Sequence, residues 1–268
     1  VCRIGKTTAL QRQMIGGTSN SIGMAIAPLV ISYLIFHGTP LHDIVTKQFI
    51  IPLIILILIM LIITLLVGKT QMPSIDNVRQ APGEKFDKSV WSFRNLKLGV
   101  WGIFFYVGIE VAVGANVNMY ASELGGSFAS NATHMAALYW GLLLLGRFLG
   151  SFIKQVPSEK QLVIASIGAI VLLVLAMLTA NPWILTLIGF FHSIMWPAIF
   201  TLATDQLGKY TTKASGVLTM GVIGGGIIPL LQGIFADVMG GNWLWTWLLV
   251  IAGEAYILYY GLNGYKQH

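Results

Sequence analysis

Residues 49–68 read FIIPLIILILIMLIITLLVG, a run of twenty residues without a charged side chain. A helix needs roughly 20 apolar residues to cross about 30 Å of hydrocarbon. Lipid cannot hydrogen-bond a bare backbone, so only helices and closed barrels span a membrane. The run is too long for a barrel strand, which takes about 10 residues per crossing. It therefore predicts a transmembrane α-helix.

Similar apolar runs lie on both sides of this stretch. They occupy residues 14–36, 98–120, 134–153, 161–180, 183–204, 214–238 and 243–262. Together with 49–68 they predict an all-α, polytopic membrane protein with eight transmembrane helices, and they make the lipid bilayer its surroundings.

The composition agrees with this fold class. Of 268 residues, 56% are hydrophobic and 10% are charged, and the mean hydropathy is +0.77. Soluble domains average about 25% charged residues, so a soluble domain and a disordered chain are both excluded. The net charge of +6 would suggest nucleic acid for a soluble protein, but here we expect no such partner. The single cysteine, Cys2, permits no internal disulfide and no cysteine-based metal site.

The positions of the cations predict the orientation. If the N-terminus is cytoplasmic, all sixteen lysines and arginines except Lys47 and Arg147 fall in inner segments. Cytoplasmic loops carry the excess of Lys and Arg. We therefore expect both termini in the cytoplasm and an even number of crossings.

One long polar stretch, residues 69–97, divides the chain. It predicts three parts: residues 1–68 with two helices of an N-terminal bundle, a central cytoplasmic linker at 69–97, and a six-helix C-terminal bundle at 98–268. Two helices stand before the linker where six would balance, and the chain opens with Val1, so we expect a fragment. Within the six helices, 98–120 and 183–204 are the most interrupted by Gly and Pro, which points to a transporter's central site.

Four motifs make the chain resemble a known family. They are FFYVGIEV (104–111), GRFLGS (146–151), FHSIMWPAIF (191–200) and GGGIIPLLQG (224–233). In this order they resemble the fucose/glucose/galactose:proton symporters of the major facilitator superfamily, from about residue 12 to the end.

The resemblance implies helices five to twelve of a twelve-helix fold in the plasma membrane. It also implies import of a hexose with protons by alternating access. The carboxylates usually assigned to proton coupling would lie in the first four helices, so we expect the fragment to be inactive alone. We expect no cofactor besides the proton as coupling ion, no metal site, and a monomer in the full-length form.

Glu110 lies in the middle of its predicted span, where an ionised group costs at least ~2.5–3.5 kcal/mol. Tyr106 lies on the same helix face, whereas Asn116 and Asn118 point in other directions. Glu110, Asn116 and Asn118 are candidate substrate-binding residues: Glu110 could accept a sugar hydroxyl or take up a proton. The alternative for Glu110 is a structural hydrogen bond to a neighbouring helix. The resemblance places a glutamate here with the glucose/galactose branch rather than the fucose branch.

His192 and Trp196 lie one turn apart on one helix face, and Pro197 leaves a backbone carbonyl without its helical donor. An aromatic ring that stacks on a sugar, with polar groups on its hydroxyls, suits a mostly apolar pocket. We therefore treat both residues as substrate-binding candidates, with plain packing as the alternative. The resemblance implies that Trp196 takes the place of the aromatic residue in the family's sugar site.

Two further candidates for sugar binding are Asn20 and Gln232. The resemblance matches Asn20 to an asparagine that faces the sugar cavity, although Gly17 replaces a glutamine common in relatives. Arg147 is expected to extend towards the cytoplasmic surface, with a gating ion pair as the alternative. Glu254 needs a partner that the sequence does not identify.

Small residues at a spacing of four predict close helix contacts, at Gly146 with Gly150 and at Gly221 with Gly225.

Two classes of function remain open at this point. One is a secondary carrier, for a hexose of the glucose, galactose, mannose or fucose type or for another small polar solute, coupled to protons or to sodium. The other is a membrane sugar sensor without transport. The sequence contains no His-Glu-x-x-His and no Gly-x-Ser-x-Gly motif, and we expect no enzyme.

Overall fold

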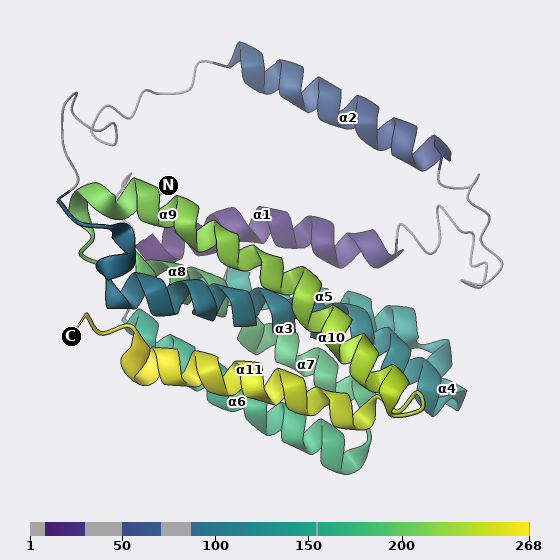
Figure 1. The fold of residues 1–268 in the computed structure, drawn as a ribbon. Coiled ribbons are helices and arrows are strands. Elements are labelled where there is room, and N and C mark those ends of the chain that lie inside the picture. The colour runs from purple at the N-terminus through teal and green to yellow at the C-terminus, as the bar shows by residue number, and fades with distance from the viewer. Residues whose placement is uncertain (1–8, 30–49, 71–86, 154, 268) are drawn as a thin grey trace. The chain divides into compact units, whose positions relative to one another are not determined.

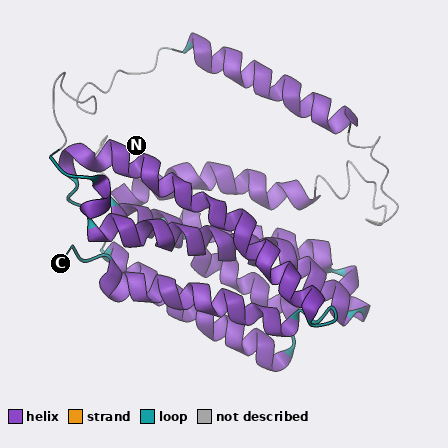
Figure 2. Ribbon diagram, in the orientation of Figure 1, coloured by secondary structure: helices purple, strands orange, loops and turns teal. Residues whose placement is uncertain are grey.

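The computed structural model of the protein describes residues 9–29, 50–70, 87–153 and 155–267, which are almost entirely helical (Figures 1 and 2). The chain forms two compact units, one of residues 27–85 and one of residues 1–26 with 86–268. In the smaller unit, α2 (Ile50–Lys69) is a helix of almost entirely apolar residues. It therefore presents a continuous apolar surface, as expected of a helix surrounded by lipid.

The larger unit contains nearly all of the remaining helical structure. Its α-helices are α1 (Ala9–Leu29, up to residue 26), α3 (Arg94–Leu124), α4 (Gly126–Ser130), α5 (Ala132–Gly150), α6 (Ser158–Thr179), α7 (Pro182–His192), α8 (Met195–Ala203), α9 (Thr211–Thr219), α10 (Gly224–Val238) and α11 (Trp247–Tyr259). Short 3₁₀ helices lie at Val90–Ser92, Gly208–Tyr210, Met220–Ile223 and Leu244–Thr246, and a π-helical turn at Tyr260–Gly264 follows α11.

Helices occupy all of the predicted apolar runs, as far as these fall within the described residues. Residues 30–36 of the predicted span 14–36 lie outside them, as do residues 71–86 of the predicted linker. Among the described residues, five helical segments are long and apolar enough to cross a membrane: 50–69, 94–124, 158–179, 182–203 and 208–238. The prediction of a helical membrane fold is confirmed at this level. The number of crossings and the three-part division stay predictions.

Helix α3 is the central helix of the larger unit. It packs against α5, α7, α8, α10 and α11, while α6 and α11 run side by side (Figure 1). Sixteen residues of α3 are buried, and small residues on its faces let neighbouring backbones come close. A Cβ on Gly108 would overlap Ile228 of α10, and a Cβ on Gly224 would overlap the carbonyl oxygen of Phe104. Helices α3 and α10 therefore touch almost backbone to backbone.

The predicted close contacts at small residues are confirmed. A Cβ added to Gly146 would overlap Ser193, and one on Gly150 would overlap Met14 of α1. A Cβ on Gly221 would lie 2.7 Å from the carbonyl oxygen of Val100, and one on Gly225 would lie 2.9 Å from Val107 Cγ1. In contrast, large apolar side chains such as Leu178 stay exposed on the outside of the unit, where lipid would cover them.

The start of α3 is fixed by polar contacts. The Nδ2 group of Asn95 lies 3.2 Å, 3.2 Å and 3.3 Å from the carbonyl oxygens of Leu202, Ala203 and Asp205, at the C-terminal end of α8 and just beyond it. The hydroxyl of Tyr210 accepts hydrogen bonds from the backbone N–H groups of residues 87 and 88, each at 3.1 Å. These contacts set where the chain enters the larger unit.

Candidate functional site

Glu110 lies in the middle of α3 and is 6% exposed. Its Oε1 atom lies 2.6 Å from the hydroxyl of Tyr106, one helical turn earlier, and 3.4 Å from Nη2 of Arg147 on α5. Tyr106 and Glu110 thus share one face of α3, as the helical spacing predicts. The acid faces protein, with a permanent cation beside it.

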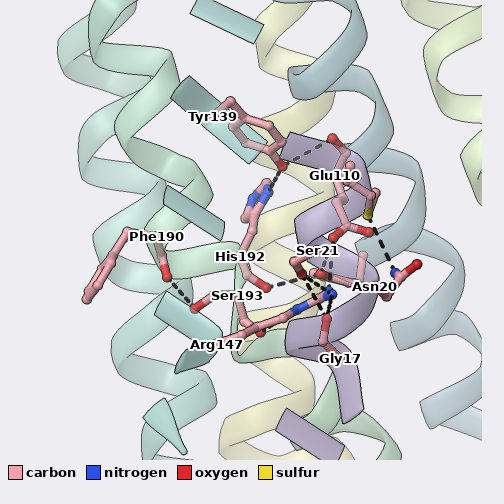
Figure 3. Close-up of polar contacts among 11 residues, drawn as sticks. Gly17, Asn20, Ser21, Glu110, Tyr139, Arg147, Phe190, His192 and Ser193 are labelled. Atoms are coloured by element: carbon pink, nitrogen blue, oxygen red, sulfur yellow. Dashed lines mark hydrogen bonds and ion pairs between the residues drawn. The ribbon is translucent and has the colours of Figure 1, made fainter. Parts of the chain in front are cut away.

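Arg147 connects four parts of the larger unit (Figure 3). Besides Glu110, its guanidinium donates through Nη1 to Ser21 Oγ at 2.8 Å and to the Gly17 carbonyl oxygen at 3.3 Å, both on α1. Its Nε donates to the Ser193 carbonyl oxygen at 3.3 Å. The residue is 6% exposed, so the prediction that it extends to the cytoplasmic surface is wrong. A buried acid and three oxygens give the guanidinium better partners inside the protein than at the surface.

The helix that carries His192 is interrupted between α7 and α8. Pro197 has no backbone N–H, so the Ser193 carbonyl oxygen lacks its usual helical donor. Arg147 supplies that donor instead. The carbonyl oxygen of His192, one residue earlier, lies 3.1 Å from the Tyr106 hydroxyl. The expectation that Pro197 leaves a carbonyl free for another partner is confirmed, and that partner is a cation.

His192 is fully buried and contacts polar groups through both ring nitrogens. Its Nδ1 lies 2.6 Å from the Tyr139 hydroxyl, and its Nε2 lies 2.6 Å from Oε1 of Glu254 on α11. The Tyr139 hydroxyl also lies 3.1 Å from the backbone carbonyl oxygen of Glu110. The partner that Glu254 requires is therefore His192.

Glu110 and Gln232 belong to two different groups of hydrogen-bonded side chains. In the second group, Nδ2 of Asn116 donates to Oε1 of Gln232 at 2.9 Å, and Nε2 of Gln232 donates to the Thr246 hydroxyl at 3.1 Å. Gln232 is fully buried and Asn116 is partly exposed. These bonds link α3, α10 and the 3₁₀ helix before α11.

The remaining predicted residues differ in their surroundings. Trp196 is partly exposed, and its ring centroid lies 6.4 Å from that of Tyr106. Asn20 on α1 is exposed, and its Nδ2 lies 3.5 Å from the sulfur of Met24. The Oδ1 atom of Asn118 is buried and has no hydrogen-bond partner within the part of the chain that the structure describes.

The structure thus brings only some of the candidates together. Glu110, His192 and Trp196 all lie around Tyr106, and Asn116 pairs with Gln232. Arg147, Tyr139 and Glu254 are not among the sugar-binding residues predicted from the sequence. The signal for Glu254 was present, because an acid inside an apolar helix requires a partner. Tyr139 carried no such signal.

Within the described ranges, no group of three or more His, Cys, Asp or Glu side chains lies close enough to hold a metal ion. The network around Glu110 and His192 is made instead of acids, one guanidinium, one imidazole and two phenols.

Residues 12–229 match the family model of the Major Facilitator Superfamily. The chain belongs to this superfamily. Its fold supports the assignment: the crystal structure of a variant of the Escherichia coli fucose:proton symporter FucP superposes with a TM-score of 0.75 at 26% identity, over 95% of this chain and 68% of that one. A second FucP structure, in the outward conformation, gives a TM-score of 0.72 at 24% identity. The chain is therefore a multi-pass membrane protein with a major facilitator fold.

Several proteins with similar sequences are sugar transporters by name. The chain is 35% identical to a putative glucose/galactose transporter of Helicobacter pylori (strain J99) over 263 residues, which cover 92% of this chain and 64% of the relative. It is 33% identical to a glucose/galactose transporter of Brucella abortus (strain 9-941), covering 97% and 65%. The chain thus spans just under two thirds of the length of these relatives. The matches confirm the resemblance to the sugar:proton symporter family.

Proposed function

We propose that this chain is part of a secondary carrier that imports a hexose together with protons by alternating access. The observation that carries the proposal is the arrangement around Tyr106. A buried acid, Glu110, and a partly exposed aromatic ring, Trp196, lie beside the interruption between α7 and α8. Aromatic and polar groups side by side suit a sugar, which has apolar CH faces and polar hydroxyls.

The proposed sugar site consists of the residues expected from the sequence. They are Asn20, Glu110, Asn116, Asn118, His192, Trp196 and Gln232. Trp196 is proposed to stack on the sugar ring, and Asn116 and Asn118 to bond its hydroxyls. Glu110, Asn116, His192 and Gln232 bond other side chains in this conformation. Sugar binding through them therefore requires that these bonds be exchanged.

Hexose as substrate is supported by the names of the relatives in Helicobacter pylori and Brucella abortus, and proton coupling by the name of the Escherichia coli symporter. The remaining parts of the proposal are eight transmembrane helices in this chain, both termini in the cytoplasm, and the plasma membrane as location. We also propose a monomeric carrier that is not an enzyme and uses no cofactor beyond the coupling proton.

Counterflow in proteoliposomes tests the proposal. The full-length gene product is reconstituted into vesicles that contain unlabelled hexose, and labelled hexose is added outside. A carrier accumulates label transiently, because exchange needs no net driving force. Unlabelled glucose, galactose, mannose and fucose compete in parallel samples to define the sugar. A sugar sensor would bind the label without exchange, and this result would reject the carrier.

A further inference from the structure

His192, one of the proposed sugar-site residues, forms a pair with Glu254 of α11. Both side chains are fully buried, at 0% exposure, and Nε2 lies 2.6 Å from Oε1. The second carboxylate oxygen, Oε2 of Glu254, is also buried and has no hydrogen-bond partner among the described residues. An ionised carboxylate in this position without a compensating charge would be costly.

The charged and titratable groups around the pair come from two helices. Helix α3 contributes Tyr106 and Glu110, and helix α5 contributes Tyr139 and Arg147. Helix α6 packs on both α7 and α11, but its ionisable residues, Glu159 and Lys160, lie in its first turn. Helix α8 has no ionisable residue, and α10 has only the exposed Asp237 near its end.

The charges nearby determine how many protons the pair of His192 and Glu254 binds. Arg147 lies beside Glu110, so these two charges compensate each other. The pair of His192 and Glu254 is neutral only when it holds one proton, either as imidazolium with carboxylate or as imidazole with carboxylic acid. Loss of this proton leaves a net negative charge in a fully buried position.

Tyr139 can hydrogen-bond Nδ1 of His192 both when the pair holds this proton and when the pair has lost it. No heavy atom has to move between the two forms. Its hydroxyl has two acceptors within reach, Nδ1 of His192 at 2.6 Å and the Glu110 carbonyl oxygen at 3.1 Å. When the pair holds its proton, Nδ1–H donates to the tyrosine oxygen, and the tyrosine donates to the Glu110 carbonyl. When the proton has left, the tyrosine hydroxyl rotates and donates to the bare Nδ1, while Nε2–H donates to the carboxylate.

We propose that His192 and Glu254 form a proton-binding site in this half of the carrier, with Tyr139 as its positioning residue. One proton passes from hydronium to Nδ1 of His192 and leaves a water molecule, so that one N–H bond forms and the charge of the pair changes from minus one to zero. The Tyr139 hydroxyl turns from Nδ1 to the Glu110 carbonyl oxygen, and no other covalent bond changes. The proposed hexose carrier would use this site as one store of its coupling proton. The proton site itself does not require that the substrate be a hexose.

Nuclear magnetic resonance of ¹⁵N-labelled histidine tests the site in the full-length protein without any sugar. The sequence contains five histidines, and the spectrum of His192→Gln identifies the signals of His192. The ring nitrogen shifts report whether Nδ1 and Nε2 each carry a proton. We expect Nδ1 of His192 to change from its protonated to its bare form as the pH rises.

The variants separate a proton site from a merely structural pair. In Glu254→Gln this titration of Nδ1 is lost, because the protonated ring would then be a buried cation without its anion. In Asp237→Asn, which changes an exposed acid, the titration stays as in the unmodified protein. Tyr139→Phe keeps a titration but shifts its midpoint, because Nδ1 loses its partner in both forms.

Ring shifts of His192 that do not change with pH in the unmodified protein would overturn the proposal. An unchanged titration in Glu254→Gln would do the same. Because no sugar is present, these results are independent of the counterflow assay. Failure of the proton site and failure of the hexose carrier are therefore distinguishable.

Discussion

Nη2 of Arg147 lies 3.4 Å from Oε1 of Glu110, and both residues are 6% exposed. This pair joins the middle of α3 to the end of α5. A buried pair of opposite charges is not itself strong evidence for stability, because both ions lose water. Removal of one partner, however, leaves the other charge uncompensated, and this asymmetry can be measured.

We expect Glu110→Gln to lower the free energy of unfolding by about 3 kcal/mol, because Arg147 then lies buried without an anion. The double variant Glu110→Gln, Arg147→Met should regain part of the lost free energy of unfolding, since no charge stays buried. Thermal unfolding of the detergent-solubilised protein measures both effects. Asp237→Asn serves as the control acid. Strictly additive effects of the two single variants would contradict the predicted pairing.

Hexose binding should weaken roughly tenfold in Trp196→Ala, because a stacking aromatic ring contributes about 1.5 kcal/mol. Isothermal titration calorimetry of the full-length protein gives the affinity. Trp245→Ala, at a residue that is 54% exposed, is the matched control and should bind normally. Binding should also weaken in Glu110→Gln, with membrane insertion retained. Unchanged affinity in both Trp196→Ala and Glu110→Gln would remove the proposed sugar site.

Gly224→Ala should destabilise the larger unit by at least 1–3 kcal/mol, roughly the cost of overpacking a core. The new methyl group would overlap the carbonyl oxygen of Phe104, and a helix backbone cannot move aside locally. Gly226→Ala is the control, because a Cβ there meets nothing within 4 Å. Thermal unfolding compares the two variants. Equal midpoints would show that α3 and α10 do not touch at Gly224.

Before α3, in the stretch between α2 and α3, Asp87 accepts a hydrogen bond at Oδ2 from Nζ of Lys209 at 2.9 Å. The hydrogen bond and the positive charge of Lys209 lower the pKa of Asp87 below its ordinary value. The ion pair therefore contributes above the ordinary pKa of aspartate and is lost as the pH falls through the lowered value.

Carboxyl-carbon NMR of Asp87 measures this titration directly. Lys209→Gln should raise the pKa of Asp87 back towards its ordinary value, and Lys97→Gln should leave it unchanged. High salt should also raise the pKa of Asp87, because it screens the exposed charges. An Asp87 pKa that does not respond to Lys209→Gln would contradict the ion pair.

The helices could be predicted from the sequence because their cause is local. An apolar run of sufficient length becomes a helix in lipid whatever lies next to it, and every predicted run contains helix where the structure describes it. The interruption near Pro197 was also predictable, because it follows from the missing backbone N–H of the proline itself. In contrast, the change from α9 to a 3₁₀ turn at Met220–Ile223 was not predicted, because it depends on how closely α10 approaches α3.

The site was predictable only within single helices. The shared face of Tyr106 and Glu110 follows from helical geometry alone. The contact of His192 with Glu254 spans 62 positions of sequence and depends on how α11 packs beside α3 and α6. Arg147 lies near a helix end, and this position predicted a side chain at the membrane surface. The residue is buried instead because Glu110 and helix α1 lie next to it in the fold, which the sequence does not reveal.

The bond of Arg147 to the carbonyl oxygen of Ser193 connects Glu110 with the interrupted helix. The guanidinium that lies beside Glu110 also bonds the carbonyl oxygen that Pro197 leaves without a helical donor. A ligand that displaced the guanidinium from the carboxylate would therefore act directly on the interruption between α7 and α8.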